Sequence, residues 1–206
     1  ETVSQAGGVL AAAKHFAGLG SVTTLLSEVG PTEMPWVVED LTVSGIASFE
    51  LESAFASIIK TRYVDRASNV RVFETYSLPS NYLPNEFEQR LDVLLKSRDF
   101  SKSNFVVMDY GHDLFNARII NMLLNSPLNL SINAQSNAGN RGFNTIARYR
   151  GAKSVFLNGS EVQLETRNKH SDLIDIVPGF AQNLNFNEAY VTNGSRGIIC
   201  WSALDG

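Results

Sequence analysis

The sequence is poor in the residues that build metal clusters and disulfides. Cys200 is the single cysteine, and the three histidines (His15, His112 and His170) are scattered along 206 residues. One cysteine excludes an internal disulfide and a thiolate metal cluster. The sequence also contains no His-x-x-x-His pair of the kind that binds zinc.

Long apolar runs and basic runs are lacking as well. The apolar segments fall well short of the about 20 residues that a membrane span needs, and no cleavable signal is visible. The formal net charge is −4, which argues against nucleic acid as the main partner. A composition of 44% hydrophobic and 18% charged residues is that of a globular protein. These features predict a cytoplasmic protein that binds neither membrane nor nucleic acid.

The two ends of the sequence look cut. The chain opens on Glu1, directly ahead of a Gly-Gly turn, and closes on Gly206 just after an expected strand. We therefore expect these residues to be part of a longer chain.

Most of the sequence alternates between helical and strand patterns, which is typical of an α/β fold. The expected helices and strands follow in chain order: helix 9–19, strand 22–26, helix 36–41, helix 85–96, strand 104–108, helix 114–124, strand 128–132, strand 154–157, a helix starting after it, helix 171–184, strand 188–191 and strand 198–201. The pattern predicts a mostly parallel sheet covered by helices.

One segment interrupts this alternation. Ser48–Glu52, Ser57–Val64 and Asn69–Tyr76 are three strand-like runs separated by short polar turns. Two of them alternate apolar with polar residues, as half-solvated antiparallel strands do. We predict a small antiparallel β lid over about residues 47–77, whose apolar face would be covered by a ligand or by a second subunit.

Three successive strands end in polar, turn-forming residues. These ends are Asp109-Tyr-Gly-His112, Asn133-Ala-Gln135 and Asn158-Gly-Ser-Glu161. The carboxyl ends of parallel strands share one edge of a sheet, where ligands bind. A polar, glycine-bearing loop over residues 136–145 belongs to the same region and is expected to be functional.

Asn158 and Glu161 allow two interpretations. Asn-x-x-Glu at the start of a helix is the pattern of a capping box, in which each side chain bonds the other residue's backbone N–H. The same pair delivers an amide and a carboxylate to the expected ligand edge. Asp109 is ambiguous in the same way, as a ligand contact or as a cap of the next helix.

Motifs along nearly the whole chain resemble those of the PfkB (ribokinase-like) carbohydrate kinases. The similarity is greatest to the heptose-kinase part of proteins that combine a heptose kinase with a nucleotidyltransferase. The matching segments occur in the family's order: Gly7-Gly8, Gly18-Leu-Gly20, Lys60-Thr-Arg62, Asp109-Tyr-Gly-His112, Tyr149-Arg-Gly-Ala152 with Asn158-Gly-Ser-Glu161, and Val191-Thr-Asn-Gly194 with Gly197. The resemblance implies a three-layer α/β/α fold with a β lid, over residues 1–206 as a partial kinase domain.

The resemblance also implies a chemistry, the transfer of the γ-phosphoryl group of ATP to a sugar hydroxyl with Mg²⁺. It assigns sugar binding to Gly7 and Gly8, contact with the sugar or with a phosphate-bound water to Asp109, and a phosphate on the sugar to Lys60 and Arg62. It assigns phosphate and nucleotide binding to Asn158, Glu161, Thr192 and Gly194, with Glu161 holding Mg²⁺ through water. Apart from the resemblance, the exposed apolar face of the β lid predicts a homodimer formed through it. Solvated charges on an exposed strand are the other interpretation of Lys60 and Arg62.

The departures from the family pattern keep other functions open. The family's Gly-Ala-Gly-Asp turn, which carries the catalytic base, is absent, so the base is expected beyond Gly206. Ala11 stands where the family has Asn, Asn133-Ala-Gln135 where it has Asp-Pro-Lys, and His112 where it has Lys. The alternatives are a non-catalytic sugar- or nucleotide-binding module and a purely structural dimerisation domain.

Overall fold

A computed structural model describes residues 2–46, 48–79, 85–97, 99–136 and 142–205. The chain divides into two compact units, Glu1–Leu83 and Pro84–Gly206, each with its own internal contacts. In the described residues, no helix is both long enough and apolar enough to cross a membrane.

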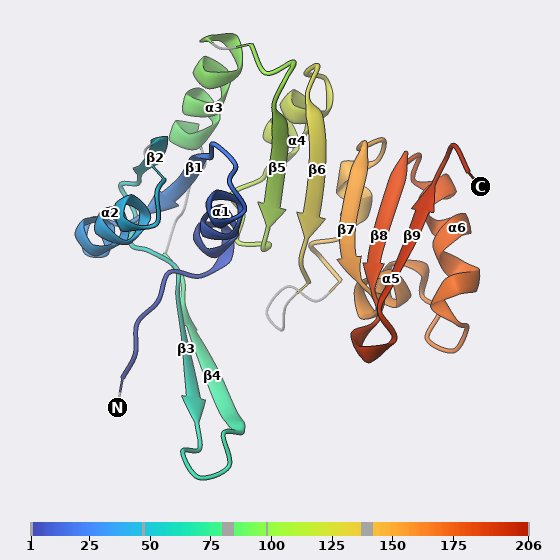
Figure 1. The fold of residues 1–206 in the computed structure, drawn as a ribbon, viewed down its shortest axis with the longest axis horizontal. Coiled ribbons are helices and arrows are strands. Elements are labelled where there is room, and N and C mark those ends of the chain that lie inside the picture. The colour runs from blue at the N-terminus through green and yellow to red at the C-terminus, as the bar shows by residue number, and fades with distance from the viewer. Residues whose placement is uncertain (1, 47, 80–84, 98, 137–141, 206) are drawn as a thin grey trace. The chain divides into compact units, whose positions relative to one another are not determined.

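The first unit combines a core built from helices and parallel strands with an antiparallel β-hairpin (Figure 1). Its elements in chain order are α1 (Gly8–Gly18), β1 (Thr24–Val29), α2 (Met34–Val43), β2 (Ser48–Glu52), β3 (Ile59–Val64) and β4 (Arg71–Ser77). Its core consists of buried apolar side chains from α1, β1, α2, β2 and the turn after α2: Ala13, Leu25, Val29, Val37, Leu41, Ile46 and Leu51. An ion pair of 2.8 Å between Lys14 Nζ and Asp40 Oδ1 joins the two helices.

The expected three-stranded lid is wrong in one strand. β2 pairs in parallel with β1, with Thr24 opposite Ser48. Leu51 of β2 is buried in the core of this unit, so the strand gains more from a buried neighbour than from a solvated hairpin. The lid therefore consists of the antiparallel pair β3 and β4, with Lys60 opposite Tyr76. Residue 47, the predicted start of the lid, lies outside the described residues, and the domain bounds remain a prediction.

The second unit is built on a five-stranded sheet. Its strands are β5 (Asn104–Asp109), β6 (Asn129–Ala134), β7 (Ser154–Asn158), β8 (Glu188–Thr192) and β9 (Ile198–Ser202), in that spatial order. The first four are parallel, and β9 is antiparallel to β8. The predicted mostly parallel α/β sheet is therefore confirmed.

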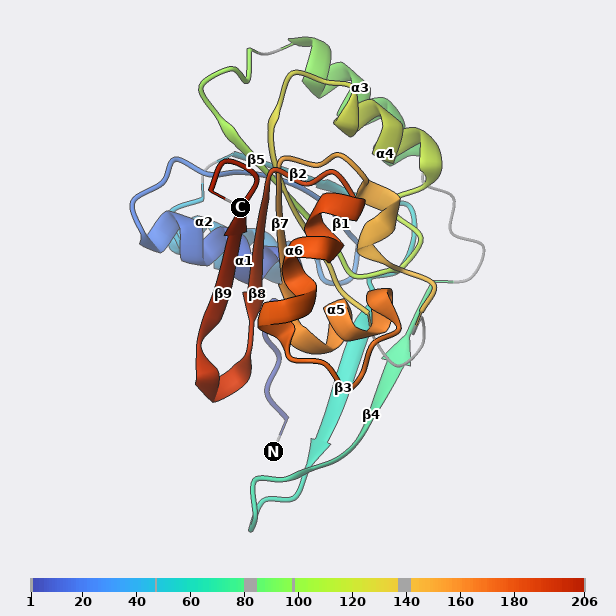
Figure 2. The same cartoon turned by 90° about the vertical axis from the view of Figure 1, so that its right-hand side faces the viewer.

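Four α-helices of the second unit lie on one side of this sheet (Figures 1 and 2). They are α3 (Asn85–Ser97), α4 (Ala117–Leu124), α5 (Gly159–Thr166) and α6 (Leu173–Asn183). Strand residues that face the helices are buried, for example Val107, Ile132 and Val155. Side chains of the other face are more exposed, and Phe156 and Tyr190 stack there with ring centroids 4.8 Å apart. The helices thus bury one sheet face and leave the carboxyl edge of the strands accessible to loops.

Candidate functional site at the carboxyl edge of the sheet

The four parallel strands of the second unit end at one edge. Asp109 pairs with Ala134 at the ends of β5 and β6, and Asn158 pairs with Thr192 at the ends of β7 and β8. The prediction that the polar strand ends share one edge is confirmed. Of the residues assigned from the sequence, Asp109, Asn158, Glu161, Thr192 and Gly194 all belong to this unit.

Asn158 and Glu161 form a complete capping box at the start of α5. The Asn158 side chain accepts a hydrogen bond of 2.9 Å from the Glu161 backbone N–H. In return, Glu161 Oε2 accepts one of 2.9 Å from the Asn158 backbone N–H. Glu161 Oε1 also accepts the backbone N–H of Ser136 at 3.3 Å, which ties the segment after β6 to this helix start. The capping interpretation is confirmed, and the role of these residues in ligand binding stays a prediction.

The position of Glu161 changes its acidity. Burial raises the pKa of the Glu161 carboxyl above its ordinary value, against the hydrogen bonds from Asn158 and Ser136 that lower it. Burial disfavours the charged form, so it outweighs donors that stabilise that form. A carboxyl with a raised pKa at a sheet edge is a common property of functional sites.

This shift predicts a pH dependence of stability. Because the folded-state pKa of Glu161 lies above that of the unfolded chain, the folded state binds more protons between the two values. The contribution of Glu161 to the free energy of unfolding therefore falls as the pH rises through that interval. We expect Glu161→Gln, which keeps an acceptor at this helix position, to flatten this fall in urea unfolding measured from pH 4 to 8. Two curves that differ by a constant amount at every pH would contradict the prediction.

Asp109 is the centre of a buried network. Its side chain is about 3% exposed, and Oδ1 accepts the Gly111 backbone N–H at 2.8 Å. Oδ2 accepts the Tyr149 hydroxyl at 2.8 Å and Arg148 Nη1 at 3.2 Å. Both carboxylate oxygens are thus engaged by protein donors. As a sugar ligand, which remains a prediction, Asp109 would have to exchange one of these bonds.

Arg148 and Tyr149 come from the 3₁₀ helix Ile146–Tyr149. Arg148 also donates to Asn144 Oδ1 and to the Phe115 carbonyl. Burial, together with the charge of Asp109, raises the pKa of the Tyr149 phenol, so this group stays a hydrogen-bond donor. Asn144 Nδ2 donates to the Asp109 carbonyl at 3.3 Å. The network fixes the end of β5 to the segment that leads into β7.

Thr192 and Gly194 lie at the end of β8. The Thr192 hydroxyl donates to the Leu157 carbonyl at 3.4 Å, and Gly194 has a φ of 58° at the start of a short 3₁₀ turn. The turn closes through the Asn193 backbone N–H, which donates to the Gly197 carbonyl at 2.8 Å. Gly194 and Gly197 are exposed, so the turn presents its backbone to solvent beside Asn158.

The remaining assigned residues belong to the first unit. Gly7 is the N-cap of α1, and Gly8 has a φ of 57°, a left-handed conformation that favours glycine. Lys60 and Arg62 lie on one face of β3 and both pair with Glu74 of β4, at 3.0 and 3.6 Å. Arg71 makes a third contact with Glu74, at 2.9 Å. Hydrogen bonding from Lys60 lowers the pKa of Glu74, so this carboxylate stays charged and leaves two positive charges in excess.

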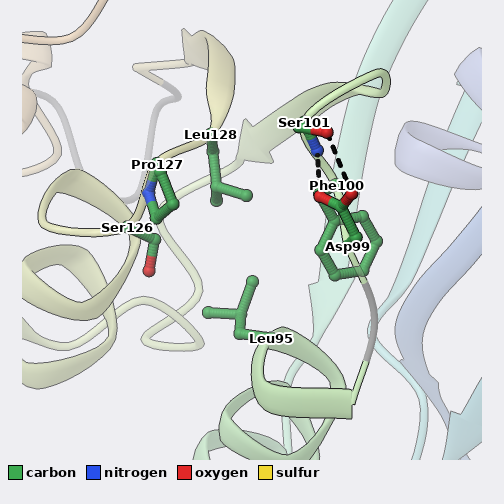
Figure 3. A pocket seen from close by; sticks show the side chains of 7 residues that line it. All are labelled: Leu95, Asp99, Phe100, Ser101, Ser126, Pro127 and Leu128. Atoms are coloured by element: carbon green, nitrogen blue, oxygen red, sulfur yellow. Dashed lines mark hydrogen bonds between the residues drawn. The ribbon is translucent and has the colours of Figure 1, made fainter.

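A pocket lies at the opposite edge of the same sheet, where β5 and β6 begin. Its volume is about 150 Å³, and it is lined by Leu95, Asp99, Phe100, Ser101, Ser126, Pro127 and Leu128 (Figure 3). Asp99 accepts hydrogen bonds from the backbone and hydroxyl of Ser101, at 2.9 and 3.0 Å. None of the residues assigned from the sequence lines this pocket, so it plays no part in the proposed function.

A direct metal cage is not formed by the part of the chain that the structure describes. Among those residues, no group of three or more His, Cys, Asp or Glu side chains is arranged to hold a metal ion. The oxygen donors at the carboxyl edge, Asn158 and Glu161, suit Mg²⁺ that keeps several of its waters. The side-chain oxygens of Asn158 and Glu161 already accept hydrogen bonds from backbone N–H groups. These two residues therefore fit contact with Mg²⁺ through water better than direct coordination.

Sequence comparisons identify no relative. No family model matches the chain, and no curated protein matches it.

Solved structures do match. Phosphofructokinase-2 from Escherichia coli, in complex with fructose-6-phosphate, matches with a TM-score of 0.75 and 14% identity over 96% of this chain and 65% of that one. The tetrameric inhibited form of the same enzyme gives a TM-score of 0.76. A ribokinase from Giardia lamblia matches with a TM-score of 0.63 and 16% identity, over 86% of this chain and 55% of that one.

These matches show the fold. The chain has the ribokinase-like fold, as the resemblance implied, and spans about two thirds of the length of the phosphofructokinase-2 chains. At such low identity the similarity shows the fold and not the activity.

Proposed function

We propose that the protein of which these residues are part transfers a phosphoryl group from ATP, with Mg²⁺, to a sugar or a sugar phosphate. The observation that carries the proposal is the shared edge of the ribokinase-like sheet, where Asn158 and Thr192 lie side by side and Glu161 follows on α5. In open α/β sheets this edge is where ligands bind. The heptose class of substrate, a fused nucleotidyltransferase and a cytoplasmic location belong to the same proposal.

Each residue has a defined part in it. Bound Mg²⁺ would neutralise charge on the transferred phosphoryl group. Glu161 and Asn158 would hold it through water, and the capping box would keep both side chains oriented. The exposed turn at Gly194, with Thr192, would lie against the nucleotide. Gly7 and Gly8 would let the backbone approach the sugar closely, because glycine has no side chain. The catalytic base is proposed to be an aspartate outside these 206 residues.

The charged face of the hairpin supports a phosphorylated substrate. Lys60, Arg62 and Arg71 surround the single carboxylate of Glu74, and their excess of two positive charges matches a phosphate ester. Glu74 would hold the cationic side chains in place before the phosphate binds. Arg62 is about half exposed, so its guanidinium remains open to a bidentate contact.

The test is a phosphoryl-transfer assay on the full-length protein, with labelled ATP and matched phosphorylated and unphosphorylated sugars. We expect transfer that requires Mg²⁺ and prefers the phosphorylated sugar. Arg62→Ala should raise KM for that sugar by about 10-fold, the equivalent of one charged hydrogen bond of about 1.5 kcal/mol. The unphosphorylated sugar should be unaffected, and Arg66→Ala, in the hairpin turn, serves as the control. Absence of both transfer and ATP binding by calorimetry would refute the proposal.

A second candidate is a non-catalytic sugar- or nucleotide-binding module. The buried network around Asp109 favours it, because both oxygens of that carboxylate are already occupied. This candidate predicts ATP or sugar binding by calorimetry without phosphoryl transfer by the full-length protein.

The hairpin also supports the proposed homodimer. Tyr63 and Phe73 stack across its strands at 4.2 Å, and both rings are about half exposed. A two-stranded hairpin has little stability by itself, so a second copy that covers these rings would stabilise it. Light scattering that finds a monomer at high concentration would contradict the dimer.

A further inference from the structure

The pocket at the amino edge of the second unit's sheet lies between two connections. One connection leads from α3 into β5 and contributes residues 99–101, and the other leads from α4 into β6 and contributes residues 126–128. The side chains of Leu95 and Leu128 point into the space between them (Figure 3). The pocket has a volume of about 150 Å³. A cavity of about this volume with apolar walls holds a ring of the size of benzene.

Apolar side chains form most of the wall of this pocket. They are Leu95, Phe100, Pro127 and Leu128, of which all except Pro127 are half-buried. An edge-on contact with Phe105 of β5, with the ring centroids 5.9 Å apart, fixes the Phe100 ring. An apolar ligand body would remove the surface that these side chains still expose to water. The wall therefore favours a ligand with an apolar body.

The polar side chains of the lining offer hydrogen-bond acceptors and no free donor. A serine hydroxyl has one proton, and a carboxylate has none. The Ser101 hydroxyl donates its proton to Asp99 at 3.0 Å, and the Ser126 hydroxyl donates its proton to the Met122 carbonyl at 2.7 Å. Both hydroxyl protons are thus already bonded within the protein. The polar group of a ligand in this pocket has to be a donor.

The charge of the lining is negative. Asp99 is its one ionisable side chain. Hydrogen bonds from the backbone N–H and the hydroxyl of Ser101 lower the pKa of Asp99, so this carboxyl is charged at neutral pH. Among the residues that the structure describes, no Lys, Arg or His forms an ion pair with it. A donor that carries a positive charge would supply the partner that Asp99 lacks.

We propose that this pocket binds a small organic ammonium ion. Its apolar body, of about the size of one benzene ring, would pack against Leu95, Phe100 and Leu128. Its ammonium group would pair with Asp99, which is exposed at the mouth of the pocket. An anionic ligand would meet a carboxylate and no free side-chain donor. The pocket contains none of the residues assigned to phosphoryl transfer, so the inference does not depend on the proposed function.

The test is a titration followed by two-dimensional amide NMR at pH 7 and constant ionic strength, with benzylammonium, benzyl alcohol and benzoate. The three probes share a ring and differ in the polar group. We expect saturable shifts of the Phe100, Ser101 and Leu128 amides with benzylammonium, at a Kd of about 1 mM. Benzyl alcohol should bind at least about 3-fold more weakly, the difference expected of an exposed ion pair, and benzoate should give no saturable shift.

Asp99→Asn should lower the affinity for benzylammonium to that for benzyl alcohol and leave the affinity for benzyl alcohol unchanged. Asp175→Asn, which removes an exposed carboxylate of α6, should keep both affinities. The absence of saturable shifts with benzylammonium, or equal affinities for the three probes, would overturn the proposal. An affinity for benzylammonium that Asp99→Asn leaves unchanged would also overturn it. If that variant fails to fold, the probe series on the wild-type protein still decides.

Discussion

Asp109→Ala is expected to lower the free energy of unfolding of the second unit by about 3 kcal/mol or more, because breaking a buried ion pair leaves its partner uncompensated. The substitution removes the acceptor of three protein donors, from Gly111, Arg148 and Tyr149. The Tyr149 phenol then remains buried without its partner. Arg148 keeps its bonds to Asn144 and the Phe115 carbonyl, which limits the loss on its side.

Urea unfolding followed by circular dichroism measures this effect. Asp92→Ala is the matched control, since Asp92 forms an exposed i,i+4 ion pair with Lys96 on α3. Such surface pairs contribute about 0.3–0.5 kcal/mol. If the two variants lose similar stability, the network at the end of β5 is not the structural centre that its geometry indicates. Asp109→Asn should lose less than Asp109→Ala, because the amide oxygen still accepts the Tyr149 hydroxyl.

Gly30→Ala is expected to destabilise the first unit by about 3 kcal/mol, the upper end of what overpacking costs. A Cβ at this position would lie 2.5 Å from the Ser57 backbone nitrogen and 2.8 Å from the Phe55 carbonyl oxygen. Both contacts are to backbone atoms, which cannot move away by a change of rotamer as side-chain atoms can. The Gly30 N–H also donates to Ser57 Oγ at 2.8 Å, a bond that a shift of this segment would break.

Hydrogen exchange of the first unit measures this change, because exchange reports the opening of each region separately. Gly18→Ala is the control: a Cβ there meets no atom within 4 Å, and alanine in a helix is favoured by about 0.5–1 kcal/mol over glycine. We expect faster exchange of β1 and α2 amides in Gly30→Ala and unchanged or slower exchange in Gly18→Ala. Equal rates in the two variants would contradict the close approach at Gly30.

Local patterns in the sequence predict the main elements of the second unit. The apolar spacing of Phe87, Leu91 and Leu94 predicts α3, and all three side chains are buried. The Asn-x-x-Glu spacing predicts the start of α5, and the capping box is formed.

Contacts between distant residues were not predictable in the same way. The pairing of β2 with β1 depends on which neighbour buries Leu51, and the sequence of β2 alone does not contain that information. Asp109 meets Arg148 and Tyr149, which are 39 and 40 residues away. The polar end of β5 therefore looks like a ligand site in the sequence, whereas in the fold it is saturated by side chains of a later segment. Only the Tyr149-Arg-Gly-Ala152 motif marks that segment in the sequence.

The division of the chain into two units has a spectroscopic consequence. The sequence contains two tryptophans; Trp36 is on α2 of the first unit and Trp201 is on β9 of the second. Trp36 is 38% exposed and Trp201 is 7% exposed, so the emission of Trp36 should lie at longer wavelength. Replacing either one by phenylalanine leaves a single tryptophan, in the other unit, which can be excited selectively over the tyrosines. Each half of the molecule thus carries its own reporter, and the order in which the halves melt can be read without any added label.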